Sequence, residues 1–166
     1  MNMNQKPMLI SSLKNDQIKD LVRLRNRRER NLAGVTIIEE PIVIRHALRA
    51  DYPISAVYFC PELVADEDRE LLDQLQALSP GPLMCELTLS VMNKVSYREK
   101  SEGILLVAPQ VRTELEDLDL AKKEAPLLLI LEAVEKPGNL GAALRIADGA
   151  GADAVMILHS FSLLKK

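Results

Sequence analysis

One segment, residues 126–158, constrains the fold of this chain more than any other. It begins with the apolar run PLLLILEAV, continues through the turn-forming residues PGNLG at 137–141 and an amphipathic run to Gly149, and ends with a second apolar run at 154–158. A continuous apolar run is typical of a strand buried on both faces of a parallel sheet. The segment therefore predicts a strand, a turn, a helix and a second strand.

The rest of the chain repeats this alternation of short strands and helices. Helical spacing of apolar residues predicts helices over 12–31, 41–50, 66–78 and 88–94. Short apolar runs predict strands over 35–38, 54–60, 83–85 and 103–108. Ser12 or Asn15 is expected to cap the first helix, and Gly34 to end it. The predicted fold class is α/β with mostly parallel sheets.

Composition limits the size and chemistry of the core. A chain of 166 residues supports one ordinary domain, or a small domain with part of another. Hydrophobic residues make up 48% of the chain and aromatic residues only 3%, so the core is expected to be aliphatic. Residues 109–125 carry alternating charge and few large apolar side chains, and they predict a linker, which we place at 111–125.

Several classes of function are not indicated. Cys60 and Cys85 have no short spacing, which favours buried thiols in a reducing compartment. No metal site is expected, because His46 and His159 are far apart and lack nearby cysteines. The amino terminus is too polar for a signal peptide, and no apolar run approaches the roughly 20 residues that span a bilayer. We therefore expect a soluble cytoplasmic protein with no membrane partner.

Charge is distributed unevenly along the chain. The net charge is −3, but residues 1–30 hold eight Lys or Arg against three Asp or Glu. The densest part of this basic segment contains five arginines, Arg23, Arg25, Arg27, Arg28 and Arg30. Such a helix is either a solvated face or a surface whose guanidinium groups contact phosphate. A second, weaker basic cluster, Lys94, Arg98 and Lys100, flanks Tyr97, a possible stacking ring.

Residues 126–158 also contain two polar residues of interest, Asn139 and Arg145. They are six positions apart, so a helix that begins at Asn139 places Arg145 roughly 9 Å along its axis. Arg145 stands on an otherwise small, apolar helix, where it either pairs with Asp148 or Glu135 or faces a phosphate or hydroxyl group. Spacing leaves both interpretations open, and residues 137–141 match neither the GxGxxG nor the P-loop pattern.

The same segment closely resembles the first conserved motif of SpoU/TrmH-type RNA ribose methyltransferases, in the SPOUT superfamily. The residues that carry the resemblance are Pro137, Gly138, Asn139, Leu140, Gly141, Arg145, Ala147, Asp148, Gly151 and Ala152. Residues 23–48 and 91–108 resemble the family's small substrate-binding domain, which has the α/β/α fold of certain ribosomal proteins. The chain has Glu39-Glu40 where the family usually has Glu-Gly.

The resemblance implies methyl transfer from S-adenosylmethionine to a ribose 2′-hydroxyl of structured RNA, ribosomal or transfer. It assigns Arg145 to activation of that hydroxyl, Asn139 to the reaction centre and Glu132 to support of the site. It also implies an RNA-binding domain over residues 1–110 and an incomplete SPOUT methyltransferase domain over 126–166. The density of positive charge adds the five arginines as expected RNA contacts.

The family's second and third motifs, which form the trefoil knot and the S-adenosylmethionine pocket, are absent from this sequence. Cofactor-binding residues therefore stay unknown, the 166-residue chain is expected to be inactive, and a homodimer of the family's type is doubtful. Two alternatives to the methyltransferase remain: a non-catalytic RNA-binding fragment, and a phosphate-binding α/β module with no role in RNA binding.

Overall fold

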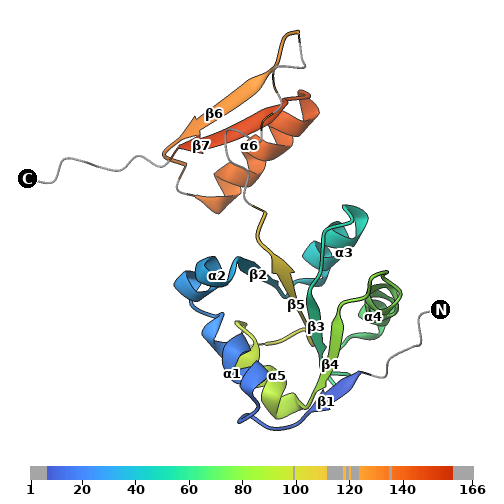
Figure 1. Ribbon diagram of the computed structural model, residues 1–166. Coiled ribbons are helices and arrows are strands. Elements are labelled where there is room, and N and C mark those ends of the chain that lie inside the picture. The colour runs from blue at the N-terminus through green and yellow to red at the C-terminus, as the bar shows by residue number, and fades with distance from the viewer. Residues whose placement is uncertain are drawn as a thin grey trace, which may run out of the picture. The chain divides into compact units, whose positions relative to one another are not determined.

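The computed structural model of the protein describes residues 7–98, 100–111, 118, 120, 124–134 and 136–158. The chain divides into two compact units, Met1–Val111 and Arg112–Lys166, and each contains its own sheet (Figure 1). The domain boundaries at residues 110 and 126 stay predictions, because most of the expected linker lies outside the described residues.

The first unit is built on a five-stranded sheet of order β1-β4-β3-β5-β2. Its strands are β1 (Met8–Ile10), β2 (Val35–Ile38), β3 (Ala56–Phe59), β4 (Leu83–Leu87) and β5 (Ile104–Pro109). Strands β1, β4 and β3 are parallel, in agreement with the prediction of mostly parallel sheets, but β5 runs antiparallel to both β3 and β2. Strand β2 lies at one edge of the sheet, so one side of its backbone has no partner strand among the described residues.

Helices cover both faces of this sheet. They are α1 (Asp16–Arg23), α2 (Arg27–Ala33), α3 (Pro41–Arg49), the 3-10 turn η1 (Asp66–Asp68), α4 (Arg69–Gln76) and α5 (Leu89–Val95). Alternate residues of β3 join separate apolar clusters. One cluster contains Ile18 of α1 and Met92 of α5, and the other contains Ile44 of α3 and Leu75 of α4. The resulting α/β/α sandwich confirms the fold expected for this part of the chain.

Both cysteines are buried and unpaired, as the sequence predicted. Cys60 and Cys85 belong to the cluster beneath α1 and α5. Burial raises the pKa of each thiol, so both are protonated at neutral pH. They contribute apolar packing to the core.

The single helix predicted over residues 12–31 is wrong, because α1 and α2 are separate helices. Asn15 caps α1 as expected, but a second cap follows at Asn26, whose side-chain oxygen accepts the backbone N–H of Arg28 at 2.8 Å. The chain turns between the helices, and Gly34 then ends α2 in a left-handed conformation, as predicted. The apolar stripe lies on α1, where Ile18 and Leu21 are buried, whereas α2 has no buried residue, so the stripe gives no support for extending one helix through residues 27–31. Strand β1, of only three residues, was not predicted at all.

The second unit contains β6 (Leu128–Glu132), α6 (Pro137–Gly149) and β7 (Ala154–Leu158). The two strands are parallel, which confirms the predicted strand, helix and strand. The predicted turn at 137–141 is wrong, since Pro137 begins α6, where a missing N–H costs nothing. Burial on both faces is typical of such an apolar run, but two strands and one helix are expected to leave much of it exposed, and Ile130 is indeed 57% exposed among the described residues.

None of the helices in the described part of the chain is both long enough and apolar enough to cross a membrane.

Position 103 is predicted to tolerate only glycine. Its φ is +81°, and a Cβ atom there would lie 2.7 Å from the backbone nitrogen of Val64. We expect Gly103→Ala to lower the free energy of unfolding by about 3 kcal/mol, from the strained dihedral and the clash together. All three tyrosines lie in the first unit and the chain has no Trp, so tyrosine fluorescence during urea unfolding reports on this unit.

Gly34→Ala is the matched control, because φ is +64° but no atom lies within 4 Å of the added Cβ. It is expected to cost only about 1 kcal/mol, the dihedral strain alone. Equal losses for the two variants would show that the contact with Val64 is unimportant.

Candidate functional site

Tyr97 organises the basic surface of the first unit. It lies in the loop after α5, and its hydroxyl donates to the carbonyl oxygen of Leu24 at 2.6 Å. The hydroxyl also accepts from Arg30, whose Nη1 donates to the carbonyl oxygens of Leu24 at 2.8 Å and Arg25 at 3.0 Å. These bonds satisfy carbonyl groups that the break between α1 and α2 leaves without helical partners.

Two guanidinium groups lie against the Tyr97 ring. The Cζ atoms of Arg25 and Arg30 are 5.6 Å and 5.5 Å from the ring centroid, within the range of cation–π contacts. Partial burial raises the pKa of the Tyr97 hydroxyl, against the opposing effect of Arg30 and Arg25. The hydroxyl therefore keeps its proton at neutral pH and remains a donor to Leu24.

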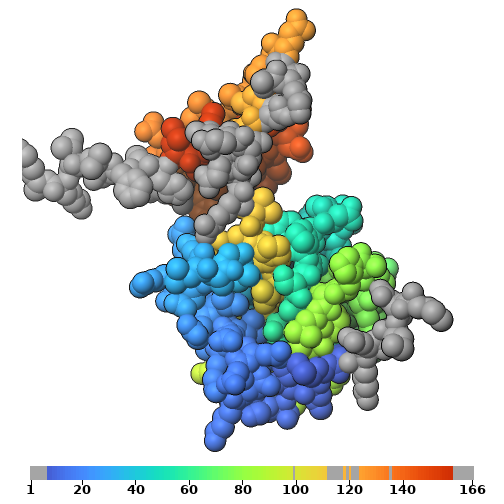
Figure 2. Space-filling model, viewed as in Figure 1, coloured from blue at the N-terminus to red at the C-terminus, as the bar shows by residue number. Residues whose placement is uncertain are grey.

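The five arginines predicted as RNA contacts divide into two groups. Arg23 pairs with Glu29 at 3.1 Å, while Arg25 and Arg30 are held by Tyr97 and by backbone carbonyl groups. Arg27 and Arg28 are exposed, and their side chains make no hydrogen bond or ion pair with the described residues. Helices α1 and α2 lie on the surface of the first unit, as the blue segment of Figure 2 shows. Arg27 and Arg28 are thus the members of the set with guanidinium groups available to a partner.

The two adjacent glutamates, Glu39 and Glu40, have different environments. Glu39 accepts from the Ser96 hydroxyl at 2.9 Å and from the backbone N–H of Tyr97 at 2.8 Å, which fixes the start of the Tyr97 loop. Glu40 precedes α3 and makes no capping bond. Its side chain is 53% exposed, with Arg98 at 3.7 Å. The backbone at Glu40 has φ −83°, so this position does not require the glycine usual in the family it resembles.

A cavity of about 570 Å³, which we call the Tyr97 pocket, opens between these groups. It is lined by Arg30, Thr36, Ile37, Ile38, Glu39, Glu40, Val43, Tyr97 and Arg98. Five of these residues, at positions 36–40, are consecutive, whereas residues that line one face of a strand alternate. The pocket therefore lies along the unpaired edge of β2 and has an apolar wall, an aromatic ring and charged groups of both signs.

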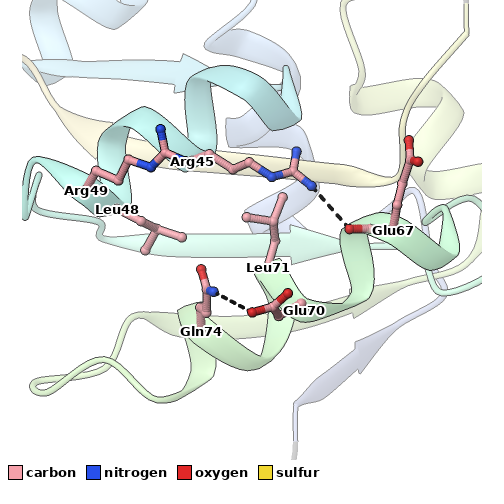
Figure 3. A pocket seen from close by; sticks show the side chains of 7 residues that line it. All are labelled: Arg45, Leu48, Arg49, Glu67, Glu70, Leu71 and Gln74. Carbon is pink, nitrogen blue, oxygen red and sulfur yellow. Dashed lines mark hydrogen bonds between the residues drawn. The ribbon is translucent and has the colours of Figure 1, made fainter.

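A second cavity, of about 420 Å³, lies between α3 and the η1–α4 segment (Figure 3). Arg45 extends across it and donates to Asp68 at 2.7 Å and to the backbone oxygen of Glu67 at 3.2 Å. Gln74 donates to Glu70 within the same cavity. Because Arg45 is already paired and acidic side chains line the wall, this cavity suits an anionic partner less well than the basic surface near Tyr97 does.

The second unit carries the predicted catalytic residues. Glu132 is the last residue of β6, where it is paired in register with Leu158 of β7. Asn139 is in the first turn of α6, and all three predicted residues, Glu132, Asn139 and Arg145, are exposed. The carboxyl ends of parallel strands and the helix start that follows are where α/β proteins place ligands, so Glu132 and Asn139 lie at the appropriate edge.

The Arg145 side chain turns back along its helix. Its Nη1 lies 3.6 Å from the position that a Cβ atom would take at Gly141, one turn earlier. This is the usual direction of long helical side chains, and it carries the guanidinium toward the start of α6. No ion pair forms with Asp148, and Glu135 lies outside the described residues. Among the described residues, Arg145 therefore has no acidic partner.

Sequence reasoning underestimated the role of Tyr97. The sequence places the Tyr97 ring beside Lys94 and Arg98, but no pattern in it connects Tyr97 with the arginines some 70 positions earlier in the chain. The interactions of Arg25 and Arg30 with Tyr97 are long-range, and no short spacing in the sequence signals them. Two features of the sequence hint at this arrangement: the dense basic segment, and a single aromatic residue within a second basic cluster.

Comparison with known proteins identifies similar sequences. Residues 15–106, more than half of the chain, match the family described as the MRM3-like substrate binding domain. The chain is 31% identical over 148 residues to the 23S rRNA (guanosine(2553)-2′-O)-methyltransferase RlmP of Bacillus subtilis. That alignment covers 89% of this chain and 53% of RlmP, so the chain spans about half the length of this relative.

Solved structures give a consistent result. The fold is similar to that of a protein described as an RNA 2′-O ribose methyltransferase, with a TM-score of 0.63, 31% identity, and coverage of 90% of this chain and 55% of the other. It also resembles the SpoU methyltransferase AviRb from Streptomyces viridochromogenes in complex with AdoMet, with a TM-score of 0.60 and coverage of 87% and 53%. At 19% identity, the second likeness shows the fold alone.

Proposed function

This chain belongs to the SpoU-type family of RNA 2′-O-methyltransferases, and from that membership we propose that it binds structured ribosomal or transfer RNA and contributes to methylation of a ribose 2′-hydroxyl. The observation that carries the proposal is Arg145, which matches the motif arginine and is exposed without an acidic partner among the described residues. The RlmP relative, by its name, acts on a guanosine of 23S rRNA.

RNA binding is assigned to the first unit, which contains the matched substrate-binding region. Arg27 and Arg28 supply exposed guanidinium groups, whose forked donors suit phosphate oxygens. Arg23, Arg25 and Arg30, the other predicted contacts, add positive potential, but their internal partners limit their direct bonds to phosphate. Phosphate contacts of this kind position RNA without reading its sequence.

S-adenosylmethionine is the methyl donor implied by the family. Such a ligand requires a cleft that buries most of its surface. The described part of the second unit is one strand pair with one helix, and Glu132 and Leu158 at the carboxyl edge are both exposed. These residues do not enclose the cofactor, so we derive no step of the reaction through it.

The roles proposed for the second unit concern the ribose. A 2′-hydroxyl is a weak nucleophile, and a guanidinium that donates to its oxygen stabilises the alkoxide and lowers the hydroxyl pKa. Arg145 is assigned this role. Asn139, with a donor and an acceptor on one side chain, is assigned to orient the ribose, and Glu132 to support the site as an acceptor.

RNA binding without catalysis is the second candidate. One observation favours it: the described residues form a basic surface but no enclosed cofactor site. RNA binding by the 166-residue chain is common to both candidates, whereas cofactor binding separates them.

The first prediction for this function concerns phosphate contacts. Replacing Arg27 and Arg28 with Ala together should weaken binding to structured RNAs of different sequence by a similar factor. The slope of log affinity against log salt should fall by about 1.5 to 2, since two phosphate contacts are lost. Arg49→Ala with Arg69→Ala removes the same charge from α3 and α4 and serves as the control. An unchanged slope in the Arg27 and Arg28 variant would mean that this face is only solvated.

The second prediction concerns the cofactor. Isothermal calorimetry with the 166-residue chain should detect no S-adenosylmethionine binding tighter than about 1 mM, which corresponds to about −4 kcal/mol. The physical reason is the exposure of the carboxyl edge of β6 and β7 among the described residues. A dissociation constant in the micromolar range would contradict this prediction and support the catalytic candidate.

The third prediction concerns Arg145 in an active enzyme. This chain would be joined to the part of Bacillus subtilis RlmP that lies beyond the match, and single-turnover methylation measured with saturating RNA. Arg145→Lys keeps the charge but loses the planar fork, so turnover should fall by roughly 100-fold or more. Asn139→Ala should also reduce turnover. Near-normal turnover of folded Arg145→Lys would assign Arg145 to a structural role.

A further inference from the structure

The Tyr97 pocket is not explained by phosphate contacts, and its chemistry identifies a more specific ligand. We propose that it receives one unstacked guanine base of the bound RNA, with the base stacked on Tyr97 and its Watson–Crick edge directed at Glu40. This inference rests on the proposed RNA binding and adds a base-reading subsite to it.

The first argument is the aromatic ring. Tyr97 is 40% exposed and lines the pocket, and Arg25 and Arg30 lie 5.6 Å and 5.5 Å from its ring centroid, so a base reaches the ring beside these guanidinium groups or in place of one of them. Its hydroxyl is bonded to Leu24 and Arg30, and its backbone N–H to Glu39, so the ring is fixed before a ligand arrives. Unpaired RNA bases stack on exposed aromatic side chains, and a ring already held in place loses little conformational freedom on binding.

The second argument is the size and polarity of the cavity. Its volume of about 570 Å³ falls within the range of about 300–1,000 Å³ found for small-ligand sites. Ile38 and Val43 supply apolar wall, and the pocket follows the edge of β2, whose outward backbone groups have no partner strand among the described residues. A flat ring with polar edges matches this combination.

The third argument distinguishes guanine from the other bases. Both carboxylate oxygens of Glu39 are occupied, by Ser96 and Tyr97. Glu40 keeps free acceptor capacity, because Arg98, at 3.7 Å, is its one ionic partner among the described residues. An ionised carboxylate only accepts hydrogen bonds. Guanine presents two adjacent N–H donors on its Watson–Crick edge, whereas the other three bases place an acceptor beside each donor.

The fourth argument connects the pocket to the RNA backbone. Arg30 lines the pocket, and Arg27 lies three positions earlier on the same face of α2. We therefore expect Arg27 to contact the phosphate that flanks a base bound in the pocket. Base and phosphate contacts would then come from one rigid group of residues around Tyr97.

The test uses the 166-residue chain and four RNA hairpins that differ only at a single bulged position, which holds guanine, hypoxanthine, adenine or no base. Fluorescence anisotropy measures each dissociation constant. We expect the abasic hairpin to bind about tenfold more weakly than the guanine hairpin, because it lacks the one base that stacks on Tyr97. Hypoxanthine lacks the 2-amino group and should bind at least threefold more weakly than guanine.

Two variants assign these preferences to residues. Tyr97→Leu should remove the difference between guanine and abasic hairpins. Tyr97→Phe keeps the ring but loses the hydroxyl bonds to Leu24 and Arg30, so it should retain a smaller difference in the same direction. Glu40→Gln should remove the preference for guanine over hypoxanthine and adenine. Tyr52→Leu and Glu70→Gln, which lie outside the pocket, are the matched controls and should retain both preferences. Circular dichroism confirms that each variant is folded.

The outcomes separate this inference from the function on which it rests. Salt-sensitive binding of all four hairpins with equal affinity overturns the base-reading subsite and leaves RNA binding intact. Preferences that survive both Tyr97→Leu and Glu40→Gln also overturn it, because the base is then read elsewhere. No binding of any hairpin by the parent chain overturns the proposed RNA binding and this inference together.

Discussion

The basic surface depends on the hydrogen bonds that Tyr97 and Arg30 make to the carbonyl groups of Leu24 and Arg25. A break between two helices leaves carbonyl groups that need partners, and a buried carbonyl without one costs free energy. Here the partners come from a loop that follows α5. The same bonds fix the Tyr97 ring and hold the Arg30 guanidinium against it, while Arg27, one turn earlier on α2, remains exposed.

Neighbouring side chains of one type perform different tasks because their surroundings differ. Glu39 is committed to the Tyr97 loop by two hydrogen bonds, whereas Glu40 remains half-exposed with capacity to accept more. The arginines divide in the same way, into those with internal partners and those without. A charged side chain that is already paired adds electrostatic potential to a surface, whereas an unpaired one can also form a direct hydrogen bond to a partner.

The second unit places its polar residues by a simpler rule. Two parallel strands joined by a helix put the end of β6 and the beginning of α6 at the same edge, which brings Glu132 and Asn139 to that edge. The direction of helical side chains then returns the Arg145 guanidinium toward the same end of the helix. Local geometry thus accounts for the arrangement without a long-range contact.

The amino-acid sequence by itself determined the α/β alternation, most element positions, the buried cysteines and the motif that contains Asn139 and Arg145, because these follow from local periodicity and residue type. Only the tertiary structure decided where the first helix breaks, which arginines stay free and how Tyr97 joins them. Those outcomes depend on contacts between residues up to 73 positions apart, such as Leu24 and Tyr97. No periodic pattern encodes such contacts, since they arise only when the sheet brings the helices together.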